Sequence, residues 1–295
     1  MSPRTEHGKS WLTAVVLILS LSPGIAWAES APVANLRLAL AAAARPANVA
    51  GKARSSSSAT PSYPRRVVSD LGALVTGPSR LDAAGWGRFG LGVAAVGLTS
   101  AFDKSIRTDI QDQRTAGSDR FAHDVRPLGQ WGALVLVGGA WVAGDASNNS
   151  TLTAVGKDGI EASILAAGLV TPLLKEIAGR SRPNADLGPH DFHPFSGSAS
   201  FPSGEATEAF AVASVISAHS HRLWVKGIAW GAAGLVGWER MNLDRHWASD
   251  IAAGALIGAS IGEWVVHRHQ PEAAAGRLQW SVAPTGRGAA VVLTW

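Results

Sequence analysis

Apolar stretches rich in Gly and Ala alternate with polar connectors along most of the chain. Six such stretches lie at about residues 86–102, 128–144, 152–178, 204–220, 222–239 and 247–267. The connectors contain Asp, Arg, Pro and Asn, which are typical of helix ends and turns. Small residues within the stretches allow helices to approach each other closely. The pattern therefore predicts an all-α fold, a compact six-helix bundle.

The last part of the chain has a different pattern. Residues 278–282 and 289–295 alternate apolar and polar positions around the turn sequence at 284–288. This alternation predicts a β-hairpin. One hairpin cannot close a barrel, so we expect residues 271–295 to form a small packed C-terminal tail.

The first 28 residues predict a secretory signal peptide. A basic start is followed by the apolar stretch 11–21, which is shorter than the roughly 20 residues needed to span a bilayer. Ala26-Trp27-Ala28 then gives a small-x-small cleavage pattern. An uncleaved anchor is the alternative, and both place the rest of the chain beyond the cytoplasmic membrane. Residues 29–66 are rich in Ala, Ser, Pro and Arg and predict a disordered leader before a helical domain at 67–270.

Composition narrows the class of protein. Apolar residues make up 46% and charged residues 16% of the chain, against about 25% charged in a typical soluble domain. The apolar runs are short enough for a soluble periplasmic bundle, but Trp residues near their ends favour a membrane interface. We expect an inner-membrane protein with a periplasmic site, with the soluble bundle as the alternative. A net charge of +4 without basic runs argues against nucleic acid as a partner, and the absence of cysteine excludes disulfides and thiol catalysis.

Three short patterns carry the candidate chemistry. They are Lys175-x6-Arg182-Pro183, Phe201-Pro202-Ser203-Gly204 and Arg240-x5-His246-x3-Asp250. Each alone is a common structural feature, respectively a pair of helix-end cations, a capped turn, and a hydrogen bond one helical turn long. Together in one chain they rarely arise by chance, so we interpret them as parts of one site.

The residue types in these patterns suit a phosphoryl group. Lys175, Arg182 and Arg240 would supply three cations for its negative charge. Ser203 and Gly204 precede an apolar helical stretch, so backbone N–H groups there would form an anion cradle at a helix start. The sequence therefore predicts a phosphate-binding site.

His246 is the candidate nucleophile. Asp250 lies four residues later, on the same face of the predicted last helix. A carboxylate in that position can hold the imidazole in one tautomer and leave its other nitrogen free to attack.

Over about residues 85–267 these motifs, in this order, resemble those of the type-2 phosphatidic acid phosphatase and vanadium haloperoxidase superfamily. The resemblance implies that His246 forms a phosphohistidine and that Asp250 orients it. It also implies phosphate binding by Lys175, Arg182, Ser203, Gly204 and Arg240. Lipid phosphates and pyrophosphates are the usual substrates of the family, and no metal is required; vanadate occupies the pocket in the haloperoxidase branch.

Two positions depart from the family pattern. Glu205 stands where the family has the His that protonates the leaving oxygen, and Glu239 stands where a Ser usually precedes the Arg of the third motif. Two interpretations of Glu205 stay open. It replaces the His as general acid, or it is only an acid favoured at a helix start, in a slowed or inactive enzyme.

The predicted function is an envelope phosphatase that hydrolyses a lipid-linked phosphomonoester or a prenyl pyrophosphate, with no cofactor. Its catalytic residues would be His246, Asp250 and Glu205. Two alternatives remain: a vanadate-dependent haloperoxidase on the same scaffold, and a non-catalytic lipid-phosphate binding protein.

Overall fold

The computed structural model describes residues 63–269, 279–285 and 288–294. The chain divides into two compact units, Met1–Ser69 and Asp70–Trp295. The predicted signal peptide and all but the last residues of the predicted leader lie outside the described residues. Helix α3 (Tyr63–Thr76) begins four residues before the predicted start of the helical domain and continues across the boundary between the units.

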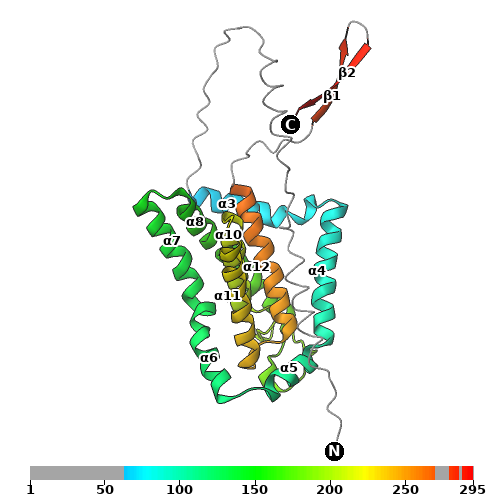
Figure 1. Cartoon of the computed structure of the whole chain (residues 1–295). Coiled ribbons are helices and arrows are strands. Elements are labelled where there is room, and N and C mark those ends of the chain that lie inside the picture. The colour runs from blue at the N-terminus through cyan, green and yellow to red at the C-terminus, as the bar shows by residue number, and fades with distance from the viewer. Residues whose placement is uncertain (1–62, 270–278, 286–287, 295) are drawn as a thin grey trace, which may run out of the picture. The chain divides into compact units, whose positions relative to one another are not determined.

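The second unit is built almost entirely of helices (Figure 1). After α3 these are, in chain order, η1 (Pro78–Arg80), α4 (Ala83–Ala101), α5 (Asp103–Asp112), α6 (Ala116–Pro127), η2 (Leu128–Gly132), α7 (Ala133–Ser147), α8 (Ser150–Ser163), η3 (Ile164–Val170), α9 (Thr171–Ala178), η4 (Pro183–Ala185), α10 (Gly204–His219), α11 (Leu223–Asn242) and α12 (Ala248–His269). The elements η2 and η3 are short π-helical segments, and η1 and η4 are 3₁₀ turns.

The all-α prediction is confirmed, but the predicted number of six helices is wrong. Each of the six predicted segments is helical, and α3, α5 and α6 are additional. The sequences of α5 and α6 are polar for most of their length, so a search for apolar stretches passed over them. Two predicted segments also contain short π-helical stretches, η2 and η3. A π-helical stretch changes the backbone hydrogen-bond pattern from i→i+4 to i→i+5, which the apolar pattern does not reveal.

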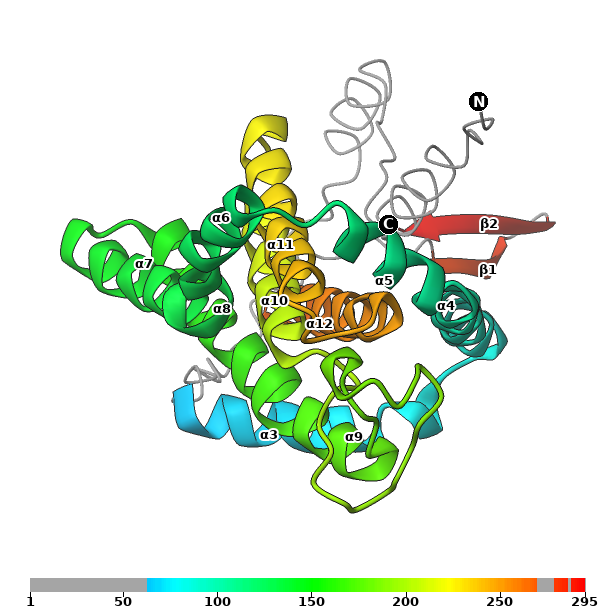
Figure 2. The same cartoon turned by 90° about the horizontal axis from the view of Figure 1, so that it is seen from below.

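Helix α10 occupies the centre of the bundle, with α8, α11 and α12 around it, while α7 and α4 lie on opposite outer sides (Figure 2). Buried apolar side chains of α10, including Ala211 and Val215, pack against those of α8, η3 and α12. Burial of this apolar surface stabilises the arrangement. The bundle therefore fixes the start of α10 relative to its neighbours.

Glycines bring α12 unusually close to α10. A Cβ atom on Gly258 would lie 2.1 Å from the backbone oxygen of Thr207, and one on Gly254 would lie 2.7 Å from that of Ser203. Only a residue without a side chain fits such an approach. This close contact places the first turn of α12 directly beside the first turn of α10.

The C-terminal tail contains two strands, β1 (Gln279–Thr285) and β2 (Gly288–Thr294). They pair antiparallel, with Gln279 opposite Thr294 and Thr285 opposite Gly288. The predicted role of this segment as a packed appendage stays a prediction.

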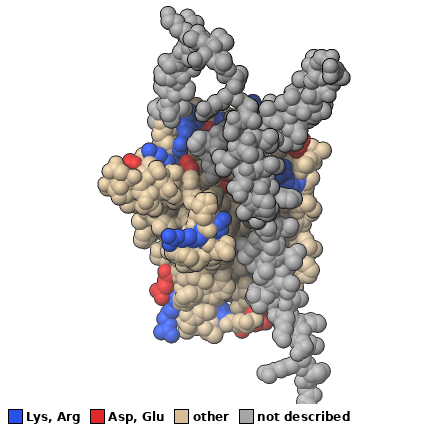
Figure 3. Space-filling model, turned by 45° about the horizontal axis from the view of Figure 1, so that its top comes forward, with Lys and Arg blue, Asp and Glu red and all other residues tan. Residues whose placement is uncertain are grey.

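Apolar side chains also cover much of the outer surface of the bundle. Figure 3 shows large areas without charged residues on the visible face. Trp86, Phe89, Val135 and Trp224 are each at least half exposed. Among the described helices, α12 alone is long and apolar enough to cross a membrane, by length and composition. Of its apolar 18-residue stretch, 61% is buried within the protein.

Candidate active site

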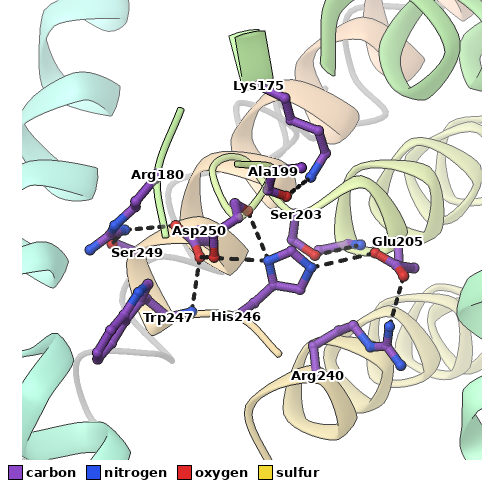
Figure 4. A network of polar contacts seen from close by, with 12 residues as sticks. Lys175, Arg180, Ala199, Ser203, Glu205, Arg240, His246, Trp247, Ser249 and Asp250 are labelled. Atoms are coloured by element: carbon purple, nitrogen blue, oxygen red, sulfur yellow. Dashed lines mark hydrogen bonds and ion pairs between the residues drawn. The ribbon is translucent and has the colours of Figure 1, made fainter. Parts of the chain in front are cut away.

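The three predicted motifs meet at one end of the bundle (Figure 4). Lys175 comes from α9, and Glu205 comes from the first turn of α10. Arg240 lies in the last turn of α11, and His246 lies in the short loop between α11 and α12. Residues far apart in the sequence therefore surround His246.

The imidazole of His246 is buried and held by the backbone of Ser200. Its Nδ1 atom lies 2.8 Å from the carbonyl oxygen of Ser200. Because a carbonyl oxygen can only accept, Nδ1 carries a proton, so the lone pair of the neutral imidazole is on Nε2. The nearest Asp250 oxygen is 3.5 Å from Nδ1, too long for a good hydrogen bond. A backbone carbonyl oxygen therefore lies closer to Nδ1 than the Asp250 carboxylate, which the sequence offered as the orienting group, does.

Asp250 instead organises the loops around His246. One carboxylate oxygen accepts from Arg180 Nη1 at 2.6 Å. The other accepts from Ser200 Oγ at 2.5 Å and from the backbone N–H of Trp247 at 2.9 Å. Asp250 therefore positions the same Ser200 whose carbonyl group holds His246.

Arg180 is the centre of this network, and sequence reasoning missed it. Its side chain is 1% exposed and donates to Asp103 at 2.7 Å, to Asp250, and to Ser249 Oγ at 2.7 Å. A signal for Arg180 existed, since it stands in the first motif two residues before Arg182. Asp103 gave no signal, because it lies in a polar connector some 70 residues before the first motif.

Arg240 is paired with two carboxylates. Its Nε and Nη2 atoms donate to the two oxygens of Glu239 at 2.6 and 2.5 Å, and Nη1 donates to Glu205 at 2.7 Å. Glu239, one of the two departures from the family pattern, thus pairs with Arg240 through a two-pronged contact. Three of the five guanidinium N–H donors are occupied in this way.

Glu205 lies between Arg240 and His246. Its second oxygen is 3.6 Å from His246 Nε2. Burial raises the pKa of Glu205, but the contacts with His246 and Arg240 outweigh burial and lower the pKa far below its ordinary value. The carboxyl group is therefore ionised in this arrangement, which does not suit the general-acid interpretation.

Lys175 and Arg182 are cations without a carboxylate partner among the described residues. Lys175 Nζ donates to the carbonyl oxygen of Ala199, and no hydrogen bond or ion pair of the Arg182 side chain occurs in the described part of the chain. Burial lowers the pKa of Lys175, while the charge of Glu205 opposes that shift. Burial and then the charge of Arg245 lower the pKa of Arg182, but a guanidinium stays protonated in proteins.

The second motif supplies a helix start. The Oγ of Ser203 caps α10 by accepting from the backbone N–H of Ala206 at 3.4 Å. The backbone N–H of Ser203 already donates to the carbonyl oxygen of Asp250 at 3.0 Å, so it cannot join the predicted anion cradle. A Cβ atom on Gly204 would lie 3.9 Å from Lys175 Cε, which places the lysine stem directly over the start of α10.

A cavity of about 380 Å³ adjoins the site. It is lined by Gly129 and Gln130 of η2, Ala167 of η3, and Gly204, Glu205 and Glu208 of α10. Burial and then the charge of Glu205 raise the pKa of Glu208 to about 7. A carboxyl group that is partly protonated at neutral pH therefore faces the same cavity as an ionised one.

A second polar cluster lies at the other end of α12, and we refer to it as the His269 cluster. It consists of Asp70, Asp158, Glu161, His219 and His269. Ligand atoms of Asp70, Glu161 and His269 lie within 4.8 Å of one another. Both nitrogens of His269 contact carboxylates, Asp158 at 2.8 Å and Asp70 at 2.6 Å. Hydrogen bonds between the imidazole and the two carboxylates therefore account for this geometry without a metal ion.

Comparisons with known proteins agree with the motifs. Residues 160–273 match the model of the PAP2 superfamily. A lipid A 1-phosphatase of Rhizobium johnstonii is 36% identical over 102 residues, which are 33% of this chain and 41% of that protein. The lipid A 1-phosphatase of Rhizobium etli is 37% identical over 101 residues, 32% of this chain and 43% of that protein. The chain thus spans about two fifths of the length of these curated relatives.

Two solved structures are similar to the chain in fold. LpxE from Aquifex aeolicus shares 24% identity over 56% of this chain and 95% of its own, with a TM-score of 0.45. A transmembrane PAP2-type phosphatidylglycerolphosphate phosphatase from Bacillus subtilis shares 20% identity over 74% of this chain and 99% of its own, with a TM-score of 0.42. The residues that match the PAP2 superfamily model, 160–273, contain all three motifs.

Proposed function

We propose that this chain is a phosphatase that hydrolyses the phosphate ester or pyrophosphate of a phosphorylated lipid through a phosphohistidine on His246. The observation that carries the proposal is the hydrogen bond from His246 Nδ1 to the Ser200 carbonyl oxygen at 2.8 Å. It leaves the Nε2 lone pair facing the group of charged side chains at the start of α10.

The cations around Nε2 suit a phosphoryl group. Lys175 and Arg182 have no carboxylate partner in the described part of the chain, so their charge is available for an anion. Backbone N–H groups in the first turn of α10 add the partial positive charge of a helix start. Arg240 would contribute its N–H groups that are not bound to Glu239.

In this mechanism Nε2 attacks phosphorus and the leaving oxygen departs on the opposite side. A phosphoryl anion and the Glu205 carboxylate are both attracted to the Arg240 guanidinium, but the two negative groups repel each other. We propose that a bound phosphoryl group takes over the contact with Arg240 from Glu205. Water then hydrolyses the phosphohistidine and frees His246.

The lipid substrate is supported by the relatives and by the surface of the bundle. The curated relatives are named lipid A 1-phosphatases. Half-exposed apolar side chains such as Phe89 and Trp224 suit contact with lipid. Together with the predicted signal peptide, they support our proposal that the activity belongs to the cell envelope, on the periplasmic side of the inner membrane.

The test is phosphate release by the purified full-length chain from a panel of lipid phosphates, prenyl pyrophosphates and soluble aryl phosphates. An acid-labile phosphoenzyme should accumulate after rapid quenching of a ³²P-labelled substrate. His246→Ala should abolish both signals, and His267→Ala, an exposed histidine on α12, should keep both. Lipid-phosphate binding without release by the wild type would favour the non-catalytic alternative, and halide oxidation with added vanadate would favour the haloperoxidase.

A further inference from the structure

Resting on the phosphatase function proposed above, we propose that Glu208 is the catalytic residue that donates a proton to the leaving oxygen. The family pattern assigns this task to the position of Glu205, which is three residues earlier on the same helix. Residues three apart on a helix lie on neighbouring parts of one face. The proton donor would thus be displaced by one helical turn along α10.

The position of Glu208 is the first argument. Its side chain lines the 380 Å³ cavity together with Gly204 and Glu205. The Cα–Cβ bonds of a helix tilt toward its N-terminus, so the side chain of Glu208 leaves the backbone in the direction of the start of α10, where the phosphoryl group would bind. Its Oε1 atom is buried and has no hydrogen-bond partner in the described part of the chain. A buried carboxyl oxygen without a partner favours the protonated form of the group, which suits a proton donor.

The engagement of Glu205 is the second argument. One of its oxygens accepts from Arg240 at 2.7 Å and the other lies 3.6 Å from His246. An ionised carboxylate in these contacts has no proton to give. Glu208 forms no such ion pair among the residues that the structure describes.

The charges around Glu208 are the third argument. The cavity walls from η2 and η3 carry only Gly129, Gln130 and Ala167, which are uncharged. The charged groups of other elements near the start of α10 interact with Glu205; they are Lys175 of α9, Arg182 of the following loop, Arg240 of α11 and His246 of the loop before α12. Burial and the charge of Glu205 hold the pKa of Glu208 at about 7. Glu208 therefore holds a proton in a useful fraction of molecules at neutral pH.

The cavity lies on the side suited to the leaving group. Glu205 contacts His246 and also lines the cavity, and a phosphoryl group that replaced it would have the nucleophile on one side and the cavity on the other. In-line displacement then directs the leaving oxygen toward the cavity and Glu208.

The proton balance closes with this residue. As Nε2 of His246 forms the N–P bond, the bond from phosphorus to the ester oxygen breaks, and that oxygen takes the Glu208 proton to leave as an alcohol. Water then attacks the phosphohistidine, the N–P bond breaks, and a proton of that water returns to the Glu208 carboxylate. His246 regains its lone pair, and inorganic phosphate is released.

The experiment measures the rate of phosphoenzyme formation in single turnovers of the full chain. The probes are dihexanoyl phosphatidic acid, which has a poor alkoxide leaving group, and p-nitrophenyl phosphate, whose leaving group needs no proton. Glu208→Gln should slow phosphorylation by the lipid about 10²–10⁴-fold and by the aryl ester only slightly. Wild-type phosphorylation by the lipid should fall as the pH rises through about 7, and this dependence should vanish in the variant. Glu208→Asp should recover part of the rate.

Controls separate this inference from the proposed function. Glu263→Gln, a partly buried acid on α12, should behave as wild type. Difference infrared spectra should show a carboxylic acid band that titrates near pH 7 and is missing in Glu208→Gln, which tests the group without any substrate. Equal slowing of both esters, or an unchanged lipid rate, would overturn the role of Glu208 while leaving the phosphatase intact. The absence of any phosphoenzyme in the wild type would overturn both.

Discussion

Each end of α12 carries a cluster of charged residues, and the two clusters differ in how their charges are paired. The helix has 22 residues, so its ends are roughly 33 Å apart. At the end near His246, Lys175 and Arg182 have no carboxylate partner among the described residues. In the His269 cluster, carboxylates, histidines and Arg268 contact one another directly.

This difference separates a site for a ligand from a site for stability. Lys175 and Arg182 are half-buried cations without a carboxylate partner in the described part of the chain, and such cations suit an external anion. A buried carboxylate such as Asp158, which accepts from His219 and His269 at 2.8 Å each, already has hydrogen-bond partners within the protein. Two clusters of similar residue types therefore differ in function, because one is internally balanced and the other is not.

The largest expected effect contrasts the two buried histidines. His246→Ala should lower kcat by on the order of 10⁶, the loss seen when a hydrolase loses its nucleophile. His269→Ala should leave kcat within a few-fold of wild type and lower the melting temperature instead, because it removes one hydrogen-bond partner from each of the carboxylates Asp70 and Asp158. Steady-state phosphate release and thermal unfolding of both variants would decide. Comparable catalytic losses in the two would break the distinction between the ends.

The second-largest expected effect comes from replacing the guanidinium group of Arg182. Arg182→Lys should reduce kcat/KM about tenfold or more, because lysine keeps the charge but cannot make a planar two-pronged contact with phosphate oxygens. Arg268→Lys is the matched change at the far end and should leave kcat/KM unchanged. Unaltered kinetics in Arg182→Lys would show that Arg182 is only a cation at a helix end.

Glu205 allows a test of the charge balance itself. Removing its negative charge in Glu205→Gln should tighten competitive inhibition by inorganic phosphate roughly tenfold, about 1.4 kcal/mol, because the anion no longer competes with a carboxylate for Arg240. Glu263→Gln is the control. Weaker inhibition in Glu205→Gln would mean that Glu205 assists phosphate binding instead of opposing it.

The sequence predicted the residues proposed to contact the phosphoryl group better than the residues that hold them in position. Lys175, Arg240 and His246 follow fixed spacings within short motifs, so their convergence could be expected. Ser200 acts through its carbonyl group, which any residue type has, so no pattern could reveal it. Asp103 reaches Arg180 from a distant polar connector, and such a contact depends on the tertiary fold.

The acids show where residue type alone misleads. Glu205 occupies the position of the family's general acid, yet its contacts with Arg240 and His246 lower its pKa. Glu208 lies within an apolar stretch and carries no motif, yet burial raises its pKa to about 7. A carboxyl group's protonation depends on burial and neighbouring charge, which only the folded arrangement supplies.

The smallest expected effect on catalysis, and the clearest on pH dependence, concerns Asp158 in the His269 cluster. Burial raises its pKa, but hydrogen bonds from His219 and His269 outweigh burial and lower the pKa below 3.8, its ordinary value. A carboxyl group with a lowered folded-state pKa stabilises the fold above its unfolded-state pKa, and this contribution is lost as the pH falls through the folded-state pKa. Asp158→Asn should therefore cost about 1–3 kcal/mol at pH 7, with kcat unchanged. The gap in unfolding free energy between variant and wild type should narrow steadily below about pH 4, where Asp158 of the unfolded wild-type chain begins to take up a proton, and close as the pH falls through the lower folded-state pKa. Urea unfolding at a series of pH values would measure the gap. A gap that stayed constant down to pH 2 would show that Asp158 contributes through packing, and the contrast between the two ends of α12 would then lose its electrostatic basis.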